Sequence, residues 1–189
     1  MKRPNISWDL IAKAVDFYQR RGYQYVETPW FVSKEALNAT MPDHKYDVGQ
    51  EIVDGYLVGS AEQGFVQLML DDEILPGKYV SVSPCHREDE EDWLHQRSFM
   101  KVELIEIDPV EDWDAVAHDM AVLAKEFFET ILESVEIVDS DVGYDILSDG
   151  IEIGSYGGKQ YMSQYQWVCG TGLAEPRFSI ALEKAIEKL

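Results

Sequence analysis

The chain has 189 residues, of which 36 are Asp or Glu and 16 are Lys or Arg, so its formal net charge is −20. This length fits one domain over residues 1–189, and 46% hydrophobic with 28% charged residues excludes a disordered tail and a membrane protein. The acidic excess disfavours a protein whose main task is to hold nucleic acid, because such proteins contact phosphates through Lys and Arg.

The sequence carries no sign of secretion or of membrane insertion. Cys85 and Cys169 are too few for a disulfide framework, and their spacing matches no zinc finger. The N-terminus lacks an apolar signal core, and no apolar run is long enough to span a bilayer. We therefore expect a soluble cytoplasmic protein that binds no membrane and uses both cysteines as small core residues.

The first third of the chain predicts a helix, a strand and a loop. Apolar residues recur at helical spacing over residues 8–18, and Gly22 would end this helix. Residues 23–28 are mostly aromatic or β-branched and predict a strand that Pro29 breaks. Residues 38–54 are polar and predict a mobile loop.

The middle of the chain predicts a capped helix and two longer strands. Residues 56–58 form a short strand that leads to Ser60, whose spacing to Gln63 is that of a helix capping box. Residues 78–85 and 98–107 predict two strands with a very acidic connection between them.

The remaining elements complete a mixed pattern. Asp108, followed by Pro109, predicts the start of a long helix. The pair Gly157-Gly158 predicts a hairpin turn between strands at 150–156 and 160–168. The last strand would end in a glycine turn that leads to a final helix. Since strands and helices do not alternate regularly, we expect an α+β fold with an antiparallel sheet covered by helices.

Two pairs of polar or aromatic residues are candidates for nucleotide and metal binding. The guanidinium of Arg87 suits a phosphate, and Phe99 could stack on a nucleobase; alternatively, Arg87 neutralises its acidic neighbours. Glu152 and Ser155 would offer hard oxygen ligands to Mg²⁺ if a bulge near Gly154 turned them to one face. Otherwise they belong to a solvated strand face.

Two further groups lie next to predicted helix starts. Gly170 and Gly172 precede a helix that carries Arg177, where glycines would let a ligand approach the backbone and the helix N-terminus would favour an anion. A plain strand-to-helix turn is the alternative. A role as helix N-cap is sufficient to explain Ser60. Glu62 either interacts favourably with the helix dipole or receives an ammonium group of a ligand.

In order and spacing, these groups resemble the catalytic domain of class II aminoacyl-tRNA synthetases, most of all the seryl type. The similarity covers residues 22–31, 58–62, 83–87 with 99–104, 152–155 and 170–177. The first of these segments, with Gly22 and Pro29, resembles a family motif that lies in a dimer interface. The resemblance therefore implies a homodimer.

The resemblance also implies a ligase that uses ATP and Mg²⁺ to form an aminoacyl-adenylate and release pyrophosphate, with Arg87, Arg177 and Glu152 as catalytic residues. The implied ATP-binding residues are Arg87, Asp89, Phe99, Glu152, Ser155, Gly172 and Arg177. The implied amino-acid-binding residues are Ser60, Glu62 and Glu103. Glu152 and Ser155 would hold Mg²⁺, and we expect no zinc, because a full set of zinc ligands is not visible.

Two departures from the family pattern concern the acceptor. Asp89 replaces a glutamate of the second motif, and five consecutive acids at 88–92 lie where a tRNA acceptor stem would be expected. We see only the catalytic core, without tRNA-binding parts, and expect a carrier protein or a metabolite as acceptor. The alternatives are a minimal seryl-like synthetase that charges tRNA through a local basic strip, and a catalytically silent paralogue that acts as a binding subunit.

Overall fold

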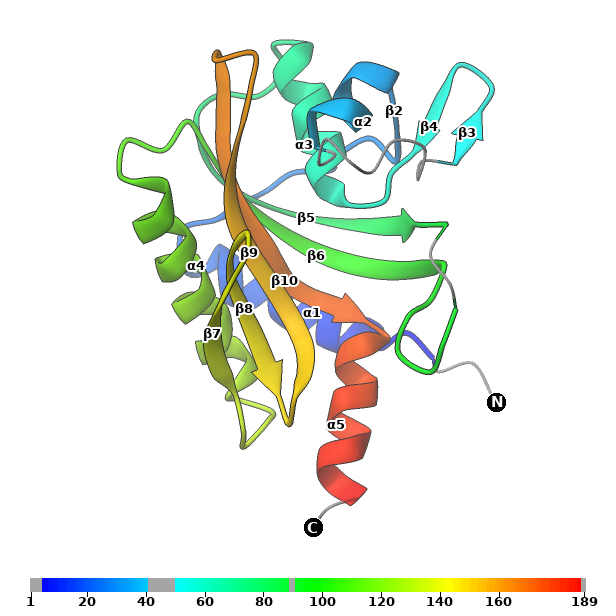
Figure 1. Ribbon diagram of the computed structural model, residues 1–189, viewed down its shortest axis with the longest axis vertical. Coiled ribbons are helices and arrows are strands. Elements are labelled where there is room, and N and C mark those ends of the chain that lie inside the picture. The colour runs from blue at the N-terminus through cyan, green and yellow to red at the C-terminus, as the bar shows by residue number, and fades with distance from the viewer. Residues whose placement is uncertain (1–4, 41–49, 89–90, 188–189) are drawn as a thin grey trace.

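The computed structural model describes residues 5–40, 50–88 and 91–187, which form five helices and ten strands (Figure 1). The helices are α1 (Trp8–Gln19), α2 (Lys34–Thr40), α3 (Ala61–Leu70), α4 (Trp113–Phe128) and α5 (Arg177–Glu187). The strands are β1 (Gln24–Tyr25), β2 (Phe31–Val32), β3 (Glu51–Ile52), β4 (Gly55–Leu57), β5 (Gly77–His86), β6 (Ser98–Ile107), β7 (Glu136–Ser140), β8 (Gly143–Ser148), β9 (Ile151–Tyr161) and β10 (Tyr165–Glu175). No helix in these residues is both long and apolar enough to cross a membrane.

Seven strands form the main sheet, in the order β1-β5-β6-β10-β9-β8-β7, and β2-β4-β3 form a small second sheet. β1 pairs with β5 in parallel, and the other neighbours in the main sheet are antiparallel. β10 lies at its centre and hydrogen-bonds to both β6 and β9. The predicted α+β fold, an antiparallel sheet flanked by helices, is confirmed.

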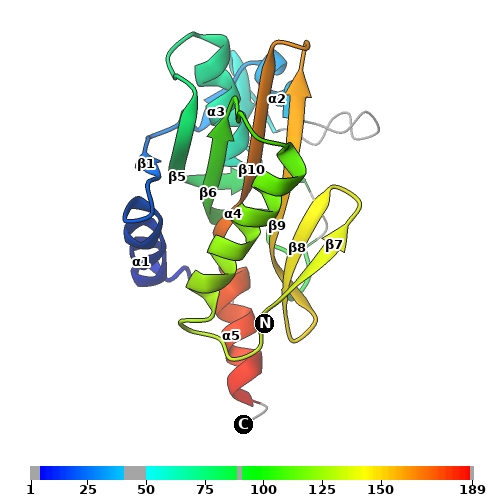
Figure 2. The same cartoon turned by 90° about the vertical axis from the view of Figure 1, so that its left-hand side faces the viewer.

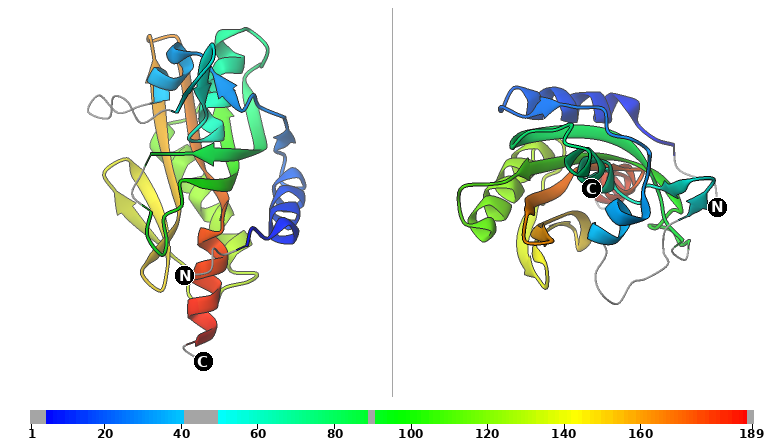
Figure 3. Two further views of the ribbon diagram at one scale, coloured as in Figure 1. Left: turned by 90° about the vertical axis from the view of Figure 1, so that its right-hand side faces the viewer. Right: turned by 90° about the horizontal axis from the view of Figure 1, so that it is seen from above.

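The two faces of the main sheet have different coverings. On β6, Val102 and Leu104 pack into the core with α1 and α4, whereas Lys101 and Glu103 line a cavity on the other face, as the alternation of side chains along a strand requires. Figure 2 shows α4 running across the strands. The view from above in Figure 3 shows α1 on one side of the curved sheet, with α2 and α3 on the other.

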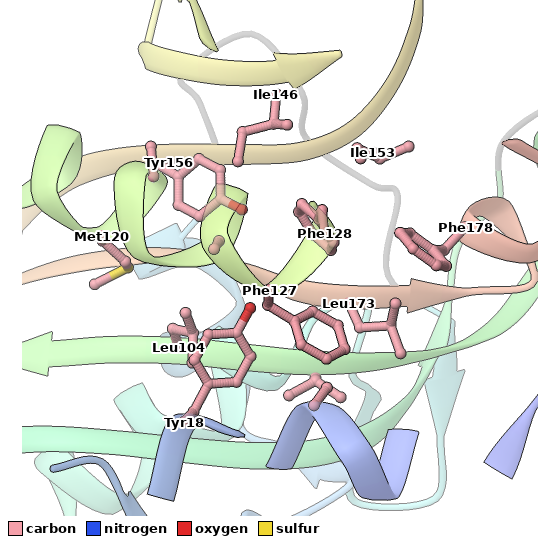
Figure 4. Packing of buried hydrophobic residues seen from close by; sticks show 14 of the residues in the cluster. Tyr18, Leu104, Met120, Phe127, Phe128, Ile146, Ile153, Tyr156, Leu173 and Phe178 are labelled. Carbon is pink, nitrogen blue, oxygen red and sulfur yellow. The ribbon is translucent and has the colours of Figure 1, made fainter. Parts of the chain in front are cut away.

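The core between the main sheet and helices α1 and α4 combines aliphatic side chains with several buried aromatic rings (Figure 4). The hydroxyl groups of the buried Tyr18 and Tyr156 donate to the carbonyl oxygens of Gly172 (2.9 Å) and Thr171 (2.6 Å). These two carbonyls lie where the β6–β10 register shifts, with Thr171 opposite Glu103 and Leu173 opposite Val102. Gly172 is therefore an extra, bulged residue, and the two phenols satisfy the backbone there.

Several predicted elements agree with the structure. α1 ends just before Gly22, which adopts the positive φ of 93° that favours glycine. Strands at 56–58, 78–85 and 98–107 correspond to β4, β5 and β6 within one or two residues. The predicted strand at 23–28 shortens to the two residues of β1.

The predicted start of α4 is wrong by four residues. Asp112, not Asp108, is the N-cap, and its carboxylate accepts from the amides of Asp114 and Ala115. Asp108 instead has a φ of 53°, and its amide donates to the carbonyl of Gln166 on β10. Continued pairing between β6 and β10 therefore outcompetes an earlier helix start.

The predicted turn at Gly157-Gly158 is also wrong, because β9 continues through both glycines to Tyr161. The chain turns at Met162 and Ser163, which have positive φ angles of 52° and 56°. A Cβ on Gly157 would lie 2.2 Å from the carbonyl oxygen of Val142. These glycines therefore permit close packing, which a sequence pattern cannot tell from a turn.

The predicted loop at 38–54 agrees only in part. α2 extends to Thr40, and β3 forms at Glu51–Ile52. Residues 41–49 lie outside the described part of the chain.

Candidate active site

A cavity of about 830 Å³ lies on the sheet face opposite α1 and α4. Its walls come from the start of α3, the ends of β5 and β6, the middle of β9, and β10 with the start of α5. The predicted site residues that line it are Ser60, Glu62, Arg87, Phe99, Glu103, Glu152, Ser155 and Arg177. The fold thus brings together residues that are more than one hundred positions apart in the sequence.

Three predicted residues lie elsewhere, and one is not described. Gly22 lies between α1 and β1, and Pro29 precedes β2, and neither residue is part of the cavity lining. Gly172 is a buried bulge residue inside β10, where a Cβ would meet Tyr18 and Val102 at 2.8 and 3.1 Å. The interpretation of Gly172 as part of a ligand-binding turn before a helix is therefore wrong, because β10 continues to Glu175. Asp89 lies outside the described residues.

We call Arg87, Phe99, Glu152, Ser155 and Arg177 the arginine group. The Arg87 Nε donates to the carbonyl of Gly59 (2.9 Å), and its guanidinium carbon lies 5.2 Å from the centre of the Phe99 ring. Arg177 Nη1 donates to Glu152 Oε1 at 3.0 Å. Both arginines are thus held by contacts within the chain, and Phe99 and Glu152 line the cavity with them.

A bulge in β9 turns Glu152 and Ser155 toward the cavity. Gly154 pairs with Ile146 and Glu152 pairs with Leu147, so Ile153 is the extra residue. The predicted bulge therefore exists, one residue earlier than expected, and both side chains line the cavity. A carboxylate and a hydroxyl are hard oxygen donors of the kind that Mg²⁺ accepts together with phosphate oxygens.

No group of three or more His, Cys, Asp or Glu residues within the described ranges is placed to hold a metal ion by itself. Glu152 and Ser155 consequently fit Mg²⁺ only as a partial ligand set. The remaining ligands would be phosphate oxygens and water, which is the usual way that a nucleotide-bound Mg²⁺ is held.

The second part of the cavity wall is built around two buried carboxylates that pair with lysines, and we call it the lysine group. Its members are Ser60, Glu62, Lys101, Glu103, Lys159, Trp167 and Cys169. Glu62 Oε2 accepts from Lys159 Nζ at 2.9 Å, and its Oε1 accepts from Trp167 Nε1 at 2.7 Å and from the Cys169 thiol at 3.2 Å. The carboxylate that was predicted to receive a substrate ammonium thus already receives one from Lys159.

This environment shifts the ionisation of Glu62 and Lys159. Burial alone raises the pKa of Glu62, but the charge of Lys159 and the three hydrogen bonds outweigh it and leave the pKa below its ordinary value. Burial lowers the pKa of Lys159, and the Glu62 charge reverses this to a net increase. Both groups are therefore charged at neutral pH.

A second pair lies beside the first. Glu103 is almost completely buried, and its Oε1 accepts from Lys101 Nζ at 2.9 Å while its Oε2 accepts from the Ser60 hydroxyl. Ser60 is also the N-cap of α3, as predicted, although its hydroxyl accepts from the amide of Glu62 rather than of Gln63. The Gln63 side chain instead accepts from the amide of Gly59 at 2.7 Å.

The two cysteines have different surroundings. Cys85 is buried, as predicted, and burial raises the pKa of its thiol to about 12. Cys169 lines the cavity, where burial and the Glu62 charge raise the pKa of its thiol. Both thiols are therefore protonated and poor nucleophiles at neutral pH.

The described part of the acidic connection folds against the cavity and α5. Leu94, His95 and Gln96 line the cavity, and Lys184 Nζ lies 3.3 Å from the centre of the Trp93 ring. Asp92 accepts hydrogen bonds from the amides of Leu94 and His95 (2.7 and 2.6 Å). Asp92 is therefore hydrogen-bonded directly to residues that line the cavity.

Sequence reasoning missed Lys101, Lys159 and Trp167. Lys101 had a usable signal, because it is two residues from Glu103 on one strand and so shares its face. Lys159 and Trp167 had none, because their partner Glu62 is on α3, about one hundred residues away in the sequence.

Comparison with known proteins identifies the family. A family model described as "tRNA synthetases class II core domain (F)" matches residues 59–183, which is more than half of the chain. The chain belongs to the class II tRNA synthetase core family. The seryl type predicted from the motifs is also found among its relatives.

Two curated relatives are serine–tRNA ligases. That of Campylobacter hominis is 28% identical over 138 residues, which are 65% of this chain and 33% of the relative. That of Cenarchaeum symbiosum is 30% identical over 135 residues, which are 64% of this chain and 32% of the relative. The class II core described here thus spans about a third of the length of these relatives.

Solved structures share the fold. A pyrrolysyl-tRNA synthetase from Desulfitobacterium hafniense has a TM-score of 0.74 at 18% identity, with 94% of this chain and 69% of that chain covered. A seryl-tRNA synthetase from Pyrococcus horikoshii, complexed with ATP, has a TM-score of 0.70 at 22% identity and covers 91% and 49%. These likenesses confirm the class II fold.

Proposed function

We propose that the chain is an ATP-dependent amino-acid-activating enzyme that transfers the activated aminoacyl group to an acceptor other than a conventional tRNA. The observation that carries the proposal is the single cavity that the arginine group and the lysine group line together. Its volume of about 830 Å³ is in the range of cavities that hold a ligand of nucleotide size.

The arginine group suits the triphosphate of ATP. Arg87 and Arg177 keep their charge and offer paired N–H donors to phosphate oxygens. Phe99, next to Arg87, offers a ring face to a nucleobase. In this arrangement the protein positions the reactants and neutralises charge and need not supply a nucleophile.

The proposed reaction begins with attack on the α-phosphate. A carboxylate oxygen of the amino acid forms a bond to this phosphorus, the bond to the oxygen that bridges to the β-phosphate breaks, and pyrophosphate leaves with the electron pair. Arg87 stabilises the negative charge that grows on the α-phosphate oxygens. Mg²⁺, when held by Glu152 and Ser155 with the phosphates, would add charge neutralisation.

The charge around the cavity supports the choice of acceptor. Glu88, Glu91 and Asp92 belong to the segment that borders it, and Asp141 lines it. Such a border repels a nucleic-acid backbone. A neutral or cationic acceptor, such as a protein or a small metabolite with a free nucleophile, approaches at lower cost.

The test is ATP–pyrophosphate exchange by the purified chain with each of the twenty amino acids. We expect exchange with one or a few of them, and exchange with none would overturn the proposed activity. The surface variant Lys125→Met serves as the matched control, because Lys125 pairs with Glu129 on the outer face of α4, away from the cavity.

Charging of tRNA is the second candidate, because the curated relatives are serine–tRNA ligases. Addition of total tRNA to the active enzyme separates the two. Acid-precipitable product that ribonuclease destroys would support tRNA charging and contradict the proposed acceptor, whereas its absence would support the proposed acceptor.

A further inference from the structure

The lysine group presents hydrogen-bond donors, and not a free carboxylate, to the cavity. Glu62 is almost completely buried and accepts from three donors: Lys159, Trp167 and Cys169. Trp167 is fully buried, so this donor is fixed in place. Glu62 is therefore the counter-ion of a residue of its own chain.

Both oxygens of Glu103 are also engaged within the chain. Its two oxygens accept from Lys101 and Ser60, and its side chain is only 1% exposed. Neither carboxylate of the lysine group thus has an unused oxygen that faces the cavity. A second ammonium group would have to share these oxygens with partners that the chain itself already supplies.

Lys159 differs from these carboxylates. Its ammonium donates to Glu62 Oε2 at 2.9 Å and to the carbonyl oxygen of Thr40 at 3.0 Å. Within the described residues, this leaves one of its three N–H groups without a partner. Its side chain is 39% exposed and lines the cavity.

From this geometry we infer that Lys159 is a specificity-determining residue, which donates its third N–H to an acceptor oxygen in the side chain of the amino-acid substrate. The inference rests on the proposed function in taking the ligand to be an amino acid. A donor at Lys159 selects substrates with a hydroxyl, carboxamide or carboxylate side chain over those with an apolar side chain of the same shape, and it rejects substrates with a cationic side chain.

The electrostatics of the group favour this selection. The charges of Glu62, Lys159, Glu103 and Lys101 sum to zero, so no net charge remains to attract a substrate ammonium. A polar group that is held in a partly buried site and left unpaired by an apolar ligand carries a desolvation cost. Sites of this kind reject analogues that lack the hydrogen-bonding group far better than apolar pockets distinguish sizes.

Isosteric amino acids provide the test. Isothermal titration calorimetry of the intact chain compares threonine with valine and asparagine with leucine, since each pair has nearly the same shape. We expect the member with the acceptor oxygen to bind about tenfold more tightly or better. Equal binding within both pairs, tighter binding of the apolar members, or no binding of any of the four would overturn the inference.

Variants assign the preference to Lys159. Lys159→Met leaves the Glu62 charge buried and unpaired, so the double variant Lys159→Met with Glu62→Gln removes both charges together. We expect the double variant to bind both members of each pair equally while ATP binding is unchanged. Persistence of the preference, or its loss together with ATP binding, would contradict the assignment. Lys125→Met should retain the full preference.

The same measurements separate this inference from the proposed function. Selective binding without pyrophosphate exchange would remove the proposed activity and leave the role of Lys159 standing. Pyrophosphate exchange without any binding preference within the amino-acid pairs would support the proposed activity and overturn the role of Lys159.

Discussion

The arginine group and the lysine group line one cavity but are built on different principles. In the arginine group, Glu152 is 46% exposed and Arg177 is 24% exposed, and a single ion pair joins them. In the lysine group, Glu62 and Glu103 are buried, and every oxygen of the two carboxylates accepts at least one hydrogen bond from the chain.

The difference follows from the cost of burying charge. A buried carboxylate must be paired and hydrogen-bonded in the folded protein itself, because no water can satisfy it. An exposed pair exchanges partners cheaply, since its attraction is screened by water. The arginine group is therefore suited to exchange its present contacts for phosphate oxygens, whereas the lysine group forms a fixed pocket wall.

The largest expected effect is on activity in the arginine group. Arg87→Ala should reduce pyrophosphate exchange by a factor on the order of 10² or more, because one charged contact to the transition state is worth about 3 kcal/mol. The circular dichroism spectrum should be unchanged. Near-full exchange activity in this variant would remove Arg87 from the proposed mechanism.

The largest expected effect on stability is in the lysine group. Glu62→Ala leaves the Lys159 charge without its counter-ion and the indole N–H of the buried Trp167 without its acceptor. We expect the free energy of unfolding to fall by about 3 kcal/mol. Urea denaturation of the variant and the wild type measures this change. A loss as small as that of a surface ion pair would contradict the fixed-wall description.

A pH series tests the same carboxylate. The pKa of Glu62 is lower in the folded chain than its ordinary value of 4.5, so its charged form stabilises the fold above that pH. This stabilisation is lost as the pH falls through the lower, folded-state pKa.

We therefore expect the stability difference between wild type and Glu62→Gln to stay constant from neutral pH down to the ordinary pKa of 4.5 and to shrink as the pH falls further. Denaturant titrations of both proteins at several pH values measure it. A difference that grows toward low pH would show that the sign is wrong.

The smallest expected effect is on stability in the arginine group. Glu152→Ala removes an exposed ion pair, so the free energy of unfolding should change by less than about 1 kcal/mol. Urea denaturation measures this, with Glu62→Ala as the contrasting variant. An equal loss in both variants would erase the distinction between the two groups.

Residues whose role depends on their neighbours in the sequence were predicted well. The cap at Ser60, the strands at 78–85 and 98–107 and the bulge considered near Gly154 all rest on local spacing, and the structure contains each of them. Most of the predicted site residues, from Ser60 to Arg177, also converge on one cavity, as the family resemblance implies.

Roles that depend on distant contacts were not predictable. The partner of Glu62 on β9 and the carbonyls that Tyr18 and Tyr156 satisfy all come from remote parts of the chain. Position 157 is a glycine inside a strand because the backbone at Val142 approaches it too closely for a side chain. Sequence patterns show which residues are small or charged, but not which residues the fold places against them.

The bulge at Gly172 has a consequence for how relatives of this chain are aligned. On β10, Cys169 and Thr171 line the cavity before the bulge, and Ala174 lines it after the bulge, so the facing positions change from odd to even numbers until the strand ends at Glu175, which also lines the cavity. The extra residue lengthens the chain between Cys169 and Arg177, and both side chains still line the cavity. A relative without this residue would keep the same cavity wall. If the two sequences were aligned without a gap at the bulge, the cavity-lining residues of that relative would be matched to residues of this chain that face the other side of the sheet.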